Sequence, residues 1–121
     1  LVPCEALTIA DSIAVGHPRH FTKGLNAITA SNGAYITVTD EEILTAMKTL
    51  ARKGAVFGEP AGVTSAAGVK EAVRTGVIDK NVTVAVLVTG NGLKDIKTAI
   101  KAAGAPVVVK PSLAAVKAAL E

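Results

Sequence analysis

Three short polar stretches hold the side chains best suited to chemistry, and each directly follows an apolar run. They are residues 39–40, 59–62 and 89–92, which read TD, EPAG and TGNG. In an open parallel sheet, ligands bind at the carboxyl ends of the strands, so residues that follow such runs are candidate ligand contacts. The sequence therefore directs attention to these three turns.

The third stretch has the most informative residue types. The hydroxyl of Thr89 can donate or accept a hydrogen bond without adding charge. Gly90 and Gly92 would let the backbone pass close to a ligand, and Asn91 tolerates a left-handed turn. An ordinary strand-to-helix turn explains the same residues, because short glycine motifs often occur without a ligand. Position alone does not make this turn a site.

The second stretch favours a helix start. Pro60 suits the first helical position, and the Glu59 carboxylate would lie beside the positive end of the helix dipole. The small residues of 62–68 suit close approach by another layer or by a flat ligand, but tight packing alone would also explain them.

Other kinds of site find little support. His17, His20 and Cys4 invite a zinc interpretation, but a structural zinc normally takes four ligands and the sequence has no further cysteine or histidine. The chain contains neither the Gly-x-Ser-x-Gly elbow of a hydrolase nor a P-loop. We therefore expect no metal site and assign no catalytic residue.

Four strand-helix units would position the three turns. Apolar, β-branched runs predict strands at 34–38, 55–57, 82–88 and 107–109. Helical spacing follows each run: a helix from a capping box at Thr39 and Glu42 to Gly54, then helices over 60–74, from Leu93 to Gly104, and over 113–120. This order predicts an α/β fold, three-layer αβα, with a mainly parallel sheet of about four strands and 82–88 at its centre.

The length of 121 residues predicts a single domain over 1–121. Its first part, 1–32, is an irregular and helical lead-in with a possible short helix at 8–14 and a second helix at 21–30. The repeated strand-helix units occupy 33–121.

Composition excludes several classes of function. The net charge of +3 is scattered along the chain, and only Phe21, Phe57 and Tyr35 are aromatic, so we expect no nucleic-acid partner. No apolar run is long enough to cross a membrane, and a single cysteine cannot form an internal disulfide. We expect a cytoplasmic protein, and the start at Leu1, without methionine, indicates a processed or truncated piece.

Four blocks of sequence together resemble the C-terminal part of the threonine synthases, within the fold-type-II family of pyridoxal-phosphate-dependent enzymes. The blocks are residues 5–18, with EALTIADSI and GHP, then 38–43, VTDEEI, then 58–61, GEPA, and finally 88–95, VTGNGLKD. The last block is the most specific. His17 stands where the family more often has asparagine.

The resemblance implies a Rossmann-like fold and a cofactor site. It implies that Thr89, followed by Gly90, hydrogen-bonds the pyridine nitrogen of pyridoxal phosphate, and that Glu59 and Ala61 lie beside the cofactor pocket. A neutral hydroxyl fits this place, since it does not force protonation of the ring nitrogen as a carboxylate would. The complete enzyme is implied to convert O-phospho-L-homoserine to L-threonine and phosphate through a Schiff base.

The family's Schiff-base lysine and glycine-rich phosphate loop belong to an earlier part of its chain and have no counterpart here. We therefore expect this chain alone to be inactive and not to bind the cofactor. Alternatives are a fragment of a sister enzyme, such as a threonine or serine dehydratase or cysteate synthase, and a non-catalytic small-molecule-binding or interaction module. The expected partners are the missing N-terminal part and, through an exposed apolar surface, further copies of the chain.

Overall fold

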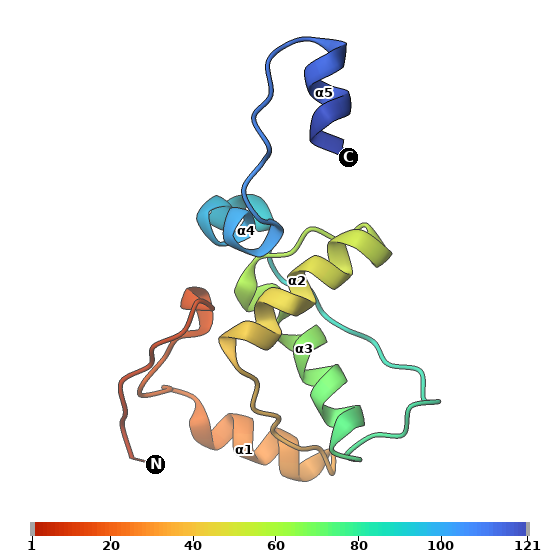
Figure 1. Cartoon of the computed structure of the whole chain (residues 1–121). Coiled ribbons are helices and arrows are strands. Elements are labelled where there is room, and N and C mark those ends of the chain that lie inside the picture. Colours follow the sequence, from red (N-terminus) through yellow and green to blue (C-terminus); the bar gives the residue numbers. More distant parts are fainter. Residues whose placement is uncertain (1, 121) are drawn as a thin grey trace.

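A computed structural model describes residues 2–120, and every regular element within them is a helix (Figure 1). Two short 3-10 helices, η1 and η2, span Asp11–Ile13 and Gly92–Asp95. The α-helices are α1 (Phe21–Ala30), α2 (Asp40–Gly54), α3 (Pro60–Arg74), α4 (Ile96–Ala103) and α5 (Leu113–Leu120).

The predicted α/β fold, a three-layer αβα arrangement with a Rossmann-like parallel sheet, is wrong for this structure. The expected strands at 34–38, 55–57, 82–88 and 107–109 have no regular secondary structure. Figure 1 shows the chain bowing outward between α3 and α4, and the end of the segment 82–88 returns to α3, where the Ser65 hydroxyl donates to the Leu87 carbonyl at 3.1 Å. A strand requires pairing with a second strand, and a local apolar pattern does not supply that partner.

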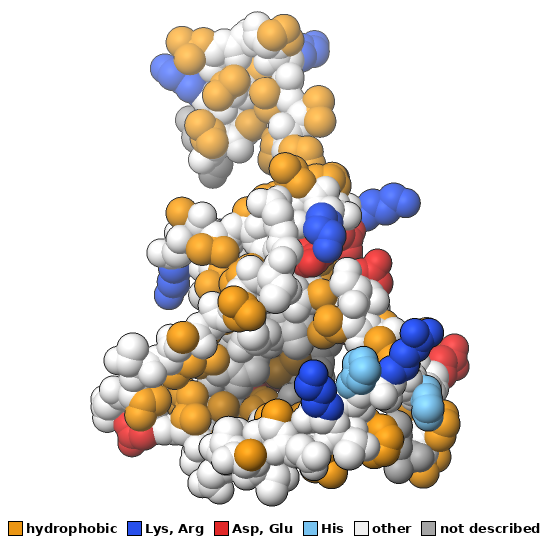
Figure 2. All heavy atoms as spheres, turned by 180° about the vertical axis from the view of Figure 1, so that it is seen from behind, with side chains coloured by type: hydrophobic (Ala, Val, Ile, Leu, Met, Phe, Trp, Pro, Cys, Tyr) orange, Lys and Arg blue, Asp and Glu red, His pale blue; other side chains and the backbone are white. Residues whose placement is uncertain are grey.

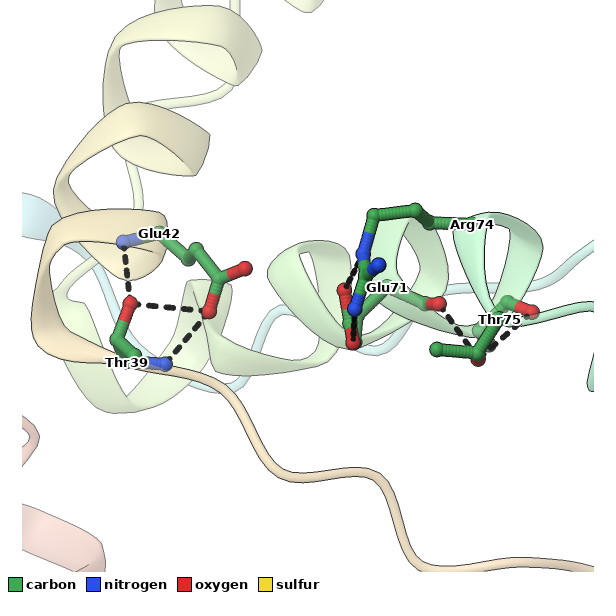
Figure 3. A network of polar contacts seen from close by, with 6 residues as sticks. Thr39, Glu42, Glu71, Arg74 and Thr75 are labelled. Atoms are coloured by element: carbon green, nitrogen blue, oxygen red, sulfur yellow. Dashed lines mark hydrogen bonds and ion pairs between the residues drawn. The ribbon is translucent and has the colours of Figure 1, made fainter.

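The helices agree well with the sequence. Residues 21–30, 60–74 and 113–120 are helical as predicted. The capping box of α2 is also confirmed, since the Glu42 N–H donates to Thr39 Oγ1 while the Thr39 N–H donates to Glu42 Oε2 (Figure 3). The possible helix at 8–14 is reduced to the single turn η1.

The core lies where α2 packs against α3 and α4. Val63, near the start of α3, is fully buried, and the small side chains around it let the helices approach closely. The buried cluster combines residues from several elements: Ala10, Ile43, Leu44, Met47, Val63, Ala67 and Ala102.

The lead-in is tied to the first residue of α2. The Thr8 hydroxyl donates to Asp40 Oδ1 at 2.6 Å, and the Ile9 N–H donates to Asp40 Oδ2 at 3.2 Å. These bonds place Ala10 in the core beside α2. One of the three polar stretches is therefore used to attach the lead-in.

Much apolar surface remains exposed. Helix α5 stands away from the other helices at the end of the segment 104–112 (Figure 1), and Leu113 and Leu120 on it are exposed. Apolar side chains are spread over the face drawn in Figure 2. Within residues 2–120, no helix combines the length and hydrophobicity that crossing a membrane requires.

Candidate functional site

Two segments far apart in sequence cross at the start of α3. The Glu59 N–H donates to the Gly90 carbonyl and the Gly92 N–H to the Phe57 carbonyl, both at 2.9 Å. An isolated antiparallel bridge between Gly58 and Asn91 results. This crossing of residues 57–59 with 90–92 brings two of the three predicted stretches together.

Glu59 occupies the crossing as the N-cap residue of α3. Pro60 follows at the first helical position, as the sequence predicts. The Glu59 side chain accepts no capping hydrogen bond from the helix and instead meets Lys94, whose Nζ lies 3.0 Å from Oε1 and 2.9 Å from Oε2. Only 5% of Glu59 is exposed, so this pair neutralises a buried carboxylate.

Glycines make the close approach possible. A methyl group at Gly90 would overlap the Glu59 carboxylate. A methyl group at Gly62, in the first turn of α3, would lie 3.0 Å from the Gly90 nitrogen and 3.3 Å from the Thr89 nitrogen. The start of α3, with half-buried Ala61, therefore lies against the backbone of Thr89 and Gly90.

Thr89 itself is exposed at the edge of the crossing. The polar groups gathered here are a neutral hydroxyl and a carboxylate already balanced by a lysine. A hydroxyl in this setting can hydrogen-bond an unprotonated ring nitrogen without driving its protonation. The Thr89 hydroxyl therefore has the chemistry that a pyridine nitrogen, such as that of pyridoxal phosphate, would need in a partner.

The sequence allowed for an ordinary capped turn at Asn91, but it did not indicate the role of Lys94. Asn91 has φ −81°, outside the left-handed region, and its Oδ1 accepts a hydrogen bond from the Leu93 N–H at 2.9 Å. Lys94 pairs with a residue 35 positions earlier. The sequence does show a lysine just beyond the polar turn. Its partner, however, depends on the crossing of residues 57–59 with 90–92, which no local pattern predicts.

The remaining polar stretch and the histidines lie in other settings. Thr39 and Asp40 are engaged in the capping box and the lead-in contacts. His17 and His20 line a hollow of about 840 Å³ together with Arg19, and Figure 2 shows histidine side chains close to basic ones. Over 2–120, no group of three or more His, Cys, Asp or Glu residues could hold a metal ion.

Comparison with known proteins gives these residues a context. The sequence pattern of the family described as "Pyridoxal-phosphate dependent enzyme" matches residues 2–90, which include Glu59, Ala61, Thr89 and Gly90. The chain belongs to this family. The resemblance seen in the four sequence blocks is thereby confirmed.

The curated relatives within this pyridoxal-phosphate-dependent family include several threonine synthases. That of Methanocaldococcus jannaschii is 41% identical over 114 residues, which cover 94% of this chain and 28% of the relative. That of Halalkalibacterium halodurans is 47% identical over 96 residues, 79% of this chain and 27% of the relative. The chain therefore spans little more than a quarter of the length of these relatives.

Proposed function

We propose that this chain is the C-terminal portion of a threonine synthase, an enzyme that converts O-phospho-L-homoserine to L-threonine and phosphate. The observation that carries the proposal is the crossing, which places Glu59 and Gly62 of α3 against the turn of Thr89 and Gly90. The identity to threonine synthases over nearly the whole chain supports it.

Thr89 has the central part in this proposal. Pyridoxal phosphate, when bound, supplies an electron sink for carbanions of the substrate. The Thr89 hydroxyl would bind the ring nitrogen, Gly90 would let the ring approach, and Glu59 with Ala61 would form the wall beside it. The pairing of Glu59 with Lys94 would keep that carboxylate from favouring protonation of the ring nitrogen.

We further propose that the chain acts only with the remaining part of such an enzyme, and in the cytoplasm. It supplies no residue matching the family's cofactor lysine or glycine-rich phosphate loop. Addition of pyridoxal phosphate to the chain, followed by borohydride, should therefore leave no stoichiometric adduct by mass spectrometry. A single lysine modified in full would contradict this.

A chimera tests the proposed activity directly. This chain replaces the aligned 114-residue segment of the Methanocaldococcus jannaschii relative, and phosphate release from O-phospho-L-homoserine is followed. We expect turnover, and a loss on the order of tenfold or more in kcat/KM for Thr89→Val, because a hydrogen bond to the ring is removed. Thr89→Ser keeps the hydroxyl and should retain most of the activity.

The same chimera separates the alternatives. Ammonia release from threonine or serine, without phosphate release from O-phospho-L-homoserine, would assign the chain to a sister dehydratase. A folded chimera that binds pyridoxal phosphate and turns over none of these substrates would favour a non-catalytic binding module. Equal activity of Thr89→Val and the parent would remove Thr89 from the site.

A further inference from the structure

We infer that Lys94 is a positioning residue of the crossing: it holds the Glu59 carboxylate over Gly90 and thereby fixes the turn that carries Thr89. The function of Thr89 rests on the proposed function above. The arrangement of Lys94, Glu59 and Gly90 rests on the geometry of this chain alone.

The burial of Glu59 shows why a partner is needed. Its carboxylate lies at a crossing flanked by Val63 and Val88, both of which would contact any side chain at Gly58. A buried carboxylate is costly unless it is paired and hydrogen-bonded. Lys94 contacts both carboxylate oxygens, while 59% of its own side chain stays exposed. Lys94 therefore compensates Glu59 with little burial of its own charge.

The place of the carboxylate is set by the missing side chain of Gly90. The backbone of Gly90 is not in the left-handed region, which among the described glycines is occupied by Gly76 and Gly104. Position 90 thus requires glycine because a side chain there would clash, and the Glu59 side chain occupies the space that it would take. The carboxylate acts as a spacer between α3 and the turn.

The pair also links three elements. Glu59 is the N-cap residue of α3, Gly90 follows Thr89 in the turn, and Lys94 lies on η2, which comes directly after that turn. Loss of the lysine would leave the carboxylate unpaired, so it would move toward water and leave Gly90 unsupported. The expected consequence is a mobile turn and a Thr89 hydroxyl without a fixed position.

Amide hydrogen exchange measured by NMR on this chain tests the inference. In Lys94→Met, the amides of Glu59 and Gly92, which form the crossing, should exchange about tenfold faster or more, the scale of a lost charge-assisted contact. The Thr89 methyl order parameter should fall, and amides in the middle of α2 should be unaffected. Lys94→Arg should restore protection, because a guanidinium can bind both oxygens.

Lys101→Met is the matched control, since it removes another lysine from an exposed position, on α4. We expect it to leave the crossing unchanged. Equal acceleration of all amides in Lys94→Met would show a general stabilising role and overturn the inference. Unchanged protection of Glu59 and Gly92 would overturn it as well.

A second pair of variants tests the spacer. Gly90→Ala should lower the midpoint of thermal unfolding, because the new methyl group displaces the carboxylate. Glu59→Ala removes that obstacle, so the double variant should be more stable than the sum of the single changes predicts. If the effects of Gly90→Ala and Glu59→Ala on stability simply add in the double variant, the proposed contact between the two residues is contradicted. These measurements need no cofactor or substrate, so their failure is distinct from failure of the proposed threonine synthase activity.

Discussion

Gly62 and Gly68 are two glycines of one helix with opposite surroundings. Gly62 faces the backbone of Thr89 and Gly90, whereas a side chain at Gly68 would meet nothing within 4 Å. Both lie within α3, Gly62 in its first turn and Gly68 in its middle. The two positions therefore contrast a glycine in close contact with a glycine beside open space.

Gly62→Ala should lower the free energy of unfolding by about 1–3 kcal/mol, because backbone atoms at the contact must shift. Gly68→Ala should raise it by about 0.5–1 kcal/mol, since alanine is the better helix former. Urea unfolding followed by circular dichroism measures both. If the two substitutions stabilise the chain equally, the contact at Gly62 is absent in solution.

At the residue scale, the sequence pointed to the residues of the candidate site but not to the way in which they meet. Glu59, Ala61, Thr89 and Gly90 followed from the resemblance, and Glu59 and Gly90 do meet at the crossing. Lys94 was missed because its ion pair spans 35 positions, and only the folded chain brings the partners together.

Helix ends are the element-scale features that local sequence describes best. Thr39→Ala should cost about 1 kcal/mol of stability, because it removes the acceptor for the Glu42 N–H in the capping box (Figure 3). Thr39→Ser keeps an acceptor and serves as the control. Thermal unfolding should distinguish them, and equal loss in both variants would argue that the methyl group of Thr39 matters instead.

The cap of α4 should make stability depend on pH. Hydrogen bonds from the side chain and backbone of Thr98 lower the pKa of the Asp95 carboxyl in the folded chain. Its contribution is therefore fully present above the unfolded pKa, about 3.9, and is lost as pH falls through the lowered folded value. The stability advantage over Asp95→Asn, whose cap is neutral, should shrink in acid.

Denaturant titrations from neutral pH down to about pH 2 check this. Arg74 also lowers the pKa of Glu71, through the exposed pair drawn in Figure 3, so the parent has a second acid-sensitive contact. The Glu71–Arg74 pair is present in both the parent and Asp95→Asn, so its contribution cancels when the two free energies of unfolding are subtracted. A difference that stays constant over the range would mean that Asp95 does not cap α4 as a carboxylate.

Helices and strands differ in how far sequence could predict them. The helices 21–30, 60–74 and 113–120 depend on local spacing and end signals, which the sequence contains. The run 82–88 has a strong strand pattern, yet it pairs with no strand within residues 2–120 and leaves Leu87 78% exposed. A strand forms only with a partner that is distant in sequence. The local run of apolar, β-branched residues therefore predicted a strand at 82–88 wrongly.

At the scale of the whole molecule, many large apolar side chains remain exposed over residues 2–120. Leu87 and Val108 are not part of the buried cluster, and 78% and 91% of these residues are accessible. Large exposed apolar surface often marks an interface. We propose that it faces the remaining part of the enzyme and, without it, further copies of the chain.

Sedimentation velocity should therefore show mass rising with concentration. Leu87→Glu and Val108→Glu should each shift the distribution toward monomer, because a charge is costly to bury at an apolar interface. Lys80→Glu adds the same residue at an exposed position and should have little effect. A monomer at every concentration would contradict self-association.

The contact between Glu59 and Gly90 also constrains how this chain can evolve. A lineage that first gains a side chain at position 90 passes through a steric clash, whereas one that first shortens Glu59 opens room for the later change. Lys94 loses its partner in the second route but stays in contact with water. The order of the two substitutions, and not only their identity, decides which sequences are reachable through folded intermediates.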